Sequence, residues 1–204
     1  MTITIEDRTE VSEAVSPFDV QDTLYDDTPN VIKNMLRVLA DRPAVPNGVE
    51  LSERVIREVC DQRELGSTSL RVDNRLSAEL SDYSFEARYT TGLNIDDLKE
   101  KVDQPQYSHP AVELSLEVYD PVDYEVQLDS NGRARSLSIL VMAINHDSVL
   151  IYDPLRYADR DVSGSLEATE VDKKEFVKGW EGRLETTTAL WIEETDQQRL
   201  SQYK

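Results

Sequence analysis

A glutamine and a pair of aspartates stand just before the first apolar helical pattern of the chain. Residues 20–29 read VQDTLYDDTP, which places Gln21, Asp26 and Asp27 ahead of Pro29. The unpaired amides and the dipole at the start of a helix favour negative charge, and many enzymes hold a nucleophile or an anion there. The loop therefore marks a candidate site at the N-terminus of a core helix.

The helix that follows this loop is predicted from the spacing of its apolar side chains. Residues 30–41 carry one wide apolar stripe, formed by Val31, Ile32, Met35, Leu36 and Leu39. Pro29 suits the first helical position, where no amide hydrogen is needed, and Asp27 or Thr28 can cap the free amides.

The remaining patterns place helices mainly before strands. A second helix carries Leu51, Val55, Ile56, Val59 and Cys60 on one face and ends at Gly66, and Leu70, Leu76 and Leu80 indicate a third. Later helices are expected at 94–102, capped by Asn94, and at 172–180; strands are expected at 84–89, 111–118, 124–128, 137–144, 149–152 and 187–192. Asn131-Gly132 and residues 145–148 predict hairpin turns.

This order predicts an α+β fold, with N-terminal helices packed on a C-terminal antiparallel sheet. We expect an arm or edge strand at 1–19, a single domain at 20–193 and a polar tail at 194–204.

The excess of acidic residues indicates a salt-rich environment and argues against nucleic acid as a partner. The chain of 204 residues has 41 acidic and 22 basic residues, a net charge of -19 and only 7 lysines against 15 arginines. A hydrated carboxylate surface of this kind is typical of halophilic proteins of the archaeal type, because salt screens the repulsion. Nucleic acid is not expected as a partner, since phosphate binding needs a basic face.

Targeting and metal signals are absent from the sequence. No apolar run approaches the roughly 20 residues that span a bilayer, and the N-terminus lacks the pattern of a signal peptide, so we expect a cytoplasmic protein without a membrane span. One cysteine and two histidines, far apart in the sequence, have no zinc-ligand spacing. We expect no cofactor and no metal, with Cys60 packed in the core and His109 and His146 on the surface.

The loop at 20–29 resembles the start of papain-like cysteine peptidases, in particular the bacteriocin-processing (double-glycine leader) peptidases. That family has a glutamine, then six residues on a cysteine, Gly-Pro and an apolar helix. When Pro29 is aligned with the family proline, Gln21 falls on the oxyanion-hole glutamine and Asp27 on the nucleophilic cysteine. The resemblance extends over roughly residues 20–193 and implies a papain-like fold.

The resemblance also covers the second half of the site. In the family a histidine opens a strand, and the returning strand ends in Asp-Pro, whose aspartate orients the histidine. Asp153-Pro154 matches that pair, and the histidine position falls on Leu137, or with one residue of slip on Ser136 or Ser138. None of the three accepts a proton near neutral pH.

On this alignment the catalytic cysteine and histidine are replaced, and Gln21, Asp27, Leu137 and Asp153 mark a degenerate site. We therefore expect an inactive homologue, not an enzyme, that binds a peptide or protein through Gln21, Tyr25, Asp26, Asp27 and Asp153. The family's cleft holds an extended segment along a strand edge, and such binding survives the loss of chemistry.

Other interpretations remain open at the level of sequence. Gln21 can bond its own loop, Asp153-Pro154 is also a common turn, and Asp27 can be a simple helix cap. The function can instead be structural, as an assembly component with an unused cleft plugged by Tyr25, Leu137 or the N-terminal arm. Asp26, Asp27 and Asp153 together could bind a cation or act as an acid/base pair, and Cys60 could be a relocated nucleophile.

Overall fold

The computed structural model describes residues 27–40, 49, 51–60, 70–104, 107–115, 136–154, 168–182 and 187–195. The helices are α2 (Asp27–Ala40), α3 (Glu53–Val59), α4 (Asp73–Leu80), the short 3-10 helix η1 (Ser81–Tyr83), α5 (Ile95–Asp103) and α6 (Lys173–Glu181). The strands are β1 (Phe85–Thr91), β2 (Ala111–Ser115), β3 (Ser136–Ile144), β4 (Ser148–Tyr152), β5 (Thr169–Asp172) and β6 (Thr188–Glu194).

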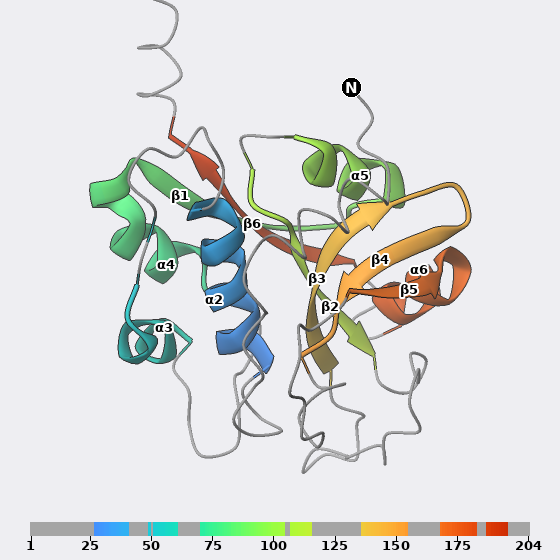
Figure 1. Cartoon of the computed structure of the whole chain (residues 1–204), viewed down its shortest axis with the longest axis horizontal. Coiled ribbons are helices and arrows are strands. Elements are labelled where there is room, and N and C mark those ends of the chain that lie inside the picture. The colour runs from blue at the N-terminus through green and yellow to red at the C-terminus, as the bar shows by residue number, and fades with distance from the viewer. Residues whose placement is uncertain are drawn as a thin grey trace, which may run out of the picture.

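The six strands form one antiparallel sheet in the order β1-β6-β2-β3-β4-β5. In Figure 1 helices α2, α3 and α4 lie to the left of β3 and β4, whereas α6 lies at the right, beside β5. The α+β class predicted from the order of elements is confirmed.

Two apolar cores cover the two faces of the sheet. One contains the buried side chains of α2, α3 and α4, and the other contains those of α5 and α6. Strand β3 supplies both, because successive side chains of a strand point to opposite faces: Leu140 and Met142 belong to the first core, and Ile139 and Val141 to the second. A strand that is buried on both faces reads as a continuous apolar run, as residues 137–144 do.

Local signals define several of the elements that frame these cores. The Asn94 side chain accepts from the amides of Asp96 and Asp97, and Asp97 bonds back to the amide of Asn94, which completes the capping box of α5. Asp172 caps α6 in the same way, through the amides of Lys174 and Glu175. The predicted cap at Asn94 and the helix predicted at 172–180 are confirmed, with Asp172 as the cap of that helix.

The structure also differs from the sequence predictions. Helix α2 begins at Asp27, two residues before the predicted first position at Pro29, so Asp27 and Thr28 lie inside its first turn instead of preceding it as caps. Strand β5 was not predicted, because Val171 is its only buried residue and the segment has no alternating apolar pattern. Its pairing with β4 defines it as a strand. Gly66, the predicted strand 124–128 and the turn at Asn131-Gly132 lie outside the described residues, as do 1–19 and most of the polar tail.

Among the described helices, none combines the length and the apolar character that crossing a membrane requires.

Candidate functional site

Asp27 lies where helix α2 meets strand β3. Its Oδ2 atom accepts a hydrogen bond of 2.8 Å from the backbone N–H of Ser138. Within the described residues, Ser138 pairs with Glu113 of β2, whereas the pairing of β3 with β4 begins at Leu140. The carboxylate therefore accepts a hydrogen bond from a backbone amide near the end of the β3–β4 ladder. A buried backbone amide without such a partner would cost free energy.

Thr28 adds a second contact between the same two elements. Its Oγ1 lies 2.8 Å from the Oγ of Ser138, and both residues are buried. Ser138 therefore meets the first turn of α2 through its backbone and through its side chain.

The structure places Ser138, and not Leu137, opposite helix α2. Leu137 is buried in the second core, with Leu98 and Val102 of α5, on the side of the sheet away from α2. Ser138, one residue along, points toward α2 because side chains alternate along β3. Leu137 therefore does not fill the space beside Asp27.

A polar seam continues along α2 toward its second turn. The Tyr152 hydroxyl donates to Asn30 Oδ1 at 2.7 Å, and Asn34 Nδ2 donates to the backbone oxygen and to Oδ1 of Asn30 at 2.8 and 2.9 Å. Asn34 and Tyr152 are fully buried. The bond between Tyr152 and Asn30 fixes the rotation of α2 against the sheet, because a buried polar group that loses its partner costs about 1–3 kcal/mol.

The carboxyl of Asp27 lies in an unusual electrostatic setting. Burial raises its pKa from 3.8 to about 6, although hydrogen bonds from Ser138 and Thr28 counter the rise, and the Glu113 carboxylate adds a smaller upward contribution. Glu113 is directly opposite Ser138 in the β2–β3 register and is itself buried, with its Oε1 accepting from the Leu70 amide at 3.4 Å. Two acidic side chains thus lie on the α2 face of the sheet.

Of the other residues predicted to bind a partner, Asp153 is the one that the structure describes. Asp153 follows β4 directly and is buried, immediately after the Tyr152 that bonds to α2. Gln21, Tyr25 and Asp26 lie outside the described residues. The structure therefore brings Asp27 together with β3.

The two histidines and the cysteine have three different environments. His146 is exposed in the β3–β4 turn, as expected, but His109 is completely buried just before β2, so the prediction of a surface residue was wrong. Ser108 and His109 precede β2 closely, and the Ser108 amide bonds to the backbone of Ile192 on β6, which draws this segment into the core.

Cys60 is buried at the end of α3, as predicted. Burial raises the pKa of its thiol to about 12; the Arg75 guanidinium lowers that pKa, while the Asp27 carboxylate raises it further. A thiol in this state is neutral and inert, because the thiolate is the reactive form. The described residues contain no group of three His, Cys, Asp or Glu side chains arranged to hold a metal ion.

Sequence reasoning named Ser138 as an alternative to Leu137, but it missed Asn30, Glu113 and Tyr152 and the contact of Thr28 with β3. Thr28 and Asn30 read as ordinary members of the helix start, and Glu113 and Tyr152 as residues of two strands. A usable signal exists for Glu113 and Ser138, since a polar residue inside an otherwise apolar strand needs a buried partner.

Comparisons with known proteins define the fold. No protein-family model matches the chain, and no curated protein matches it. A C39-like peptidase from Bacillus anthracis is similar in structure, with a TM-score of 0.55, 14% identity, and 90% of this chain and 96% of that chain covered. A double glycine motif protease from an AMS/PCAT transporter, in complex with the leader peptide, has a TM-score of 0.51 and 13% identity over 88% of this chain and 92% of that chain.

These neighbours are peptidases with the C39 papain-like fold, and the chain has that fold. At these identities the likeness concerns the arrangement of helices and strands.

Proposed function

We propose that this chain is a non-catalytic papain-like domain that binds a peptide or protein partner at the start of α2, in a salt-rich cytoplasm. The hydrogen bond from the Ser138 amide to the Asp27 carboxylate carries this proposal. It joins the two elements on which the resembling peptidases carry their nucleophile and their base, the start of the core helix and the start of the strand.

The groups at this junction are poor replacements for a thiolate and an imidazole. Amide cleavage through an acyl intermediate needs an activated nucleophile and a base within hydrogen-bond reach. Asp27 supplies a weakly nucleophilic carboxylate, and the Ser138 hydroxyl, held by Thr28, does not accept a proton near neutral pH. Cys60, the one cysteine of the chain, is buried as a neutral thiol.

The same groups suit recognition of a partner with a positively charged group. Asp27 remains partly exposed, and no ion pair among the described residues includes it. A peptide amine or a basic side chain would provide the missing countercharge and lower the desolvation cost of this partly buried carboxylate. The transporter protease found in complex with a leader peptide supports a peptide as the class of ligand.

Selection from a displayed random peptide library, at high potassium chloride, tests this proposal. We expect enriched peptides to carry a basic residue or to require a free amino terminus. Asp27→Asn should weaken their binding by about 10-fold to 100-fold, because a hydrogen bond to a charged group contributes about 1.5–3 kcal/mol. Fluorescence anisotropy measures the affinity, and mass spectrometry checks whether the bound peptide stays intact.

Asp96→Asn is the matched control, because Asp96 is an exposed aspartate in the first turn of α5, away from this junction. Equal affinities for wild type and Asp27→Asn would refute the assignment of the site. Cleavage of selected peptides that depends on Asp27 would refute the non-catalytic assignment.

A carboxylate-based enzyme is the second candidate, and the raised pKa of Asp27 favours it. A pKa of about 6 lies in the range that suits general acid–base work near neutral pH. In that case hydrolysis of peptides or esters would be lost in Asp27→Asn and would follow a titration near pH 6.

A further inference from the structure

A cavity lies on the opposite side of the sheet from α2, against α6. It has a volume of about 650 Å³, and its lining includes the β3–β4 turn and the exposed side of α6. That volume is within the range of sites that hold small molecules. Because α6 packs in the second core and α2 in the first, this cavity is separate from the junction of Asp27 and Ser138.

Lysines gather at this cavity in an acidic chain, beside the carboxyl groups of Asp147, Asp172 and Glu181. Three of the 7 lysines of the protein, Lys173, Lys174 and Lys178, line it. Lys174 and Lys178 are one helical turn apart, about 5–6 Å between their Cβ atoms, a spacing at which like charges destabilise a helix. Among the described residues neither lysine has an ion pair, whereas Lys99, Arg54 and Arg88 all do.

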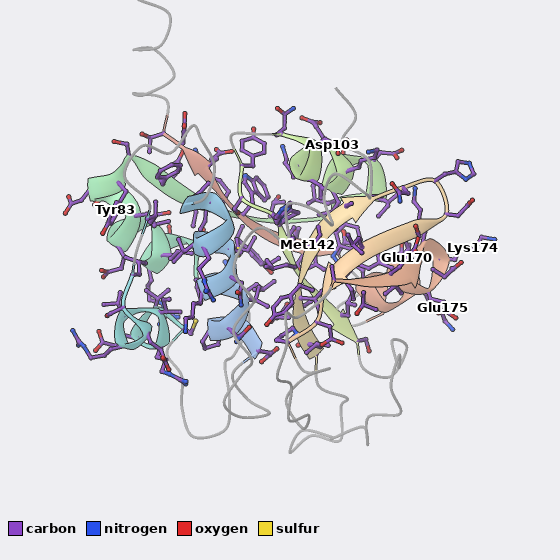
Figure 2. The ribbon with its side chains drawn as sticks, in the orientation of Figure 1. Tyr83, Asp103, Met142, Glu170, Lys174 and Glu175 are labelled. Atoms are coloured by element: carbon purple, nitrogen blue, oxygen red, sulfur yellow. The ribbon has the colours of Figure 1, made fainter. Side chains whose placement is uncertain are left out.

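Two of the three acidic members of the lining already have hydrogen-bond partners. Asp172 Oδ1 accepts from two amides of α6, and Asp147 Oδ1 is 2.7 Å from Nδ1 of His146. Glu181, the third acidic member, lies near the C-terminal end of α6, beyond Lys178. Figure 2 shows Lys174 projecting from the outer end of the molecule, opposite the end that carries Tyr83.

The wall of the cavity is also held in place before any ligand binds. The Lys173 amide donates to the backbone oxygen of Asp147 at 3.0 Å, and its Nζ donates to that of Asn145 at 3.3 Å. These bonds attach the start of α6 to the β3–β4 turn. A preformed wall lowers the entropy cost of binding.

We propose that this cavity binds a small dianion, a phosphate monoester or a dicarboxylate, between the ammonium groups of Lys174 and Lys178. Ammonium groups bind such oxyanions as compact point charges, and one dianion would relieve the repulsion between the two lysines.

Titration of the 15N-labelled protein with inorganic phosphate, and separately with succinate, at constant ionic strength tests this site. We expect the amide signals of residues 173–182 and 146–147 to shift with saturation. Lys174→Gln/Lys178→Gln should weaken the binding by about tenfold or more, because each pair of opposite charges is a charge-assisted contact. The two titrations distinguish a phosphate ligand from a carboxylate ligand.

Arg54→Gln/Arg57→Gln is the matched control, since it removes the same two positive charges from the exposed side of α3. Its spectrum and that of the lysine variant show directly whether each protein is folded. An equal loss of binding in both variants would mean that the anions sense only the net charge, which overturns the proposal. The absence of shifts at α6 with both anions overturns it as well.

Discussion

Replacing Asp27 by asparagine should stabilise the protein above pH 6, although the residue begins a helix. The folded state holds the Asp27 proton more tightly than the unfolded chain, because burial raises the pKa from 3.8 to about 6. The stability linked to this proton is complete below about pH 3.8 and is lost as the pH rises through about 6. At about 1.4 kcal/mol for each pKa unit, the loss approaches 3 kcal/mol.

Asparagine keeps the acceptor for the Ser138 amide and removes the charge. The free energy of unfolding of Asp27→Asn should therefore exceed that of wild type by up to about 3 kcal/mol at pH 7.5, and the gain should shrink toward zero near pH 4. Urea titration in potassium chloride, followed by tryptophan fluorescence, measures this difference across pH. The reporters are Trp180 and Trp191, which are 2% and 8% exposed in the described core.

Two opposing effects decide the sign of this prediction. The dipole and amides of α2 favour a charged Asp27, with about 0.3–1 kcal/mol expected at a surface helix start, whereas desolvation favours the neutral form more strongly. In the control Asp96→Asn the charge lies at the exposed start of α5, so its removal should destabilise the protein slightly at neutral pH. The opposite result would be a wild type that is more stable than Asp27→Asn at pH 7.5, with a larger difference at pH 7.5 than at pH 4.5. That result would refute the expectation that burial disfavours the charged form of Asp27.

Three further predictions concern the packing around α2. Cys60 should resist thiol reagents in the native state and react only on unfolding, because burial raises its pKa to about 12; rapid native labelling would instead support a relocated nucleophile. Tyr152→Phe should cost about 0.5–1.5 kcal/mol of unfolding free energy, since it removes one hydrogen bond to the buried Asn30 oxygen, which keeps Asn34 as a donor; denaturant titration measures the loss, and an unchanged stability would mean that the Tyr152–Asn30 bond contributes nothing. Thr28→Val and Ser138→Ala should be coupled by about 0.5–1.5 kcal/mol in a double-mutant cycle; strictly additive losses would mean that the hydroxyl contact contributes nothing.

Local patterns in the sequence determined the elements. The apolar stripe of α2, the capping box that starts at Asn94 and the turn closed by the 2.8 Å bond from the Asn145 amide to Ser148 each depend on residues within a few positions of one another. Such features can be predicted from sequence because their interaction partners lie close along the chain. The resemblance to leader peptidases added the order of the elements, and the α+β papain-like fold is confirmed.

Tertiary structure alone decided which groups meet at the candidate site. The alternation along β3 turned Ser138 toward Thr28 and Leu137 into the opposite core, a choice that one residue of register reverses. The pairing of β2 with β3 brought Glu113 beside Ser138, and the bond from Ser108 to β6 drew His109 inward. These contacts join residues far apart in the chain, and their burial and charge depend on neighbours that no local pattern specifies.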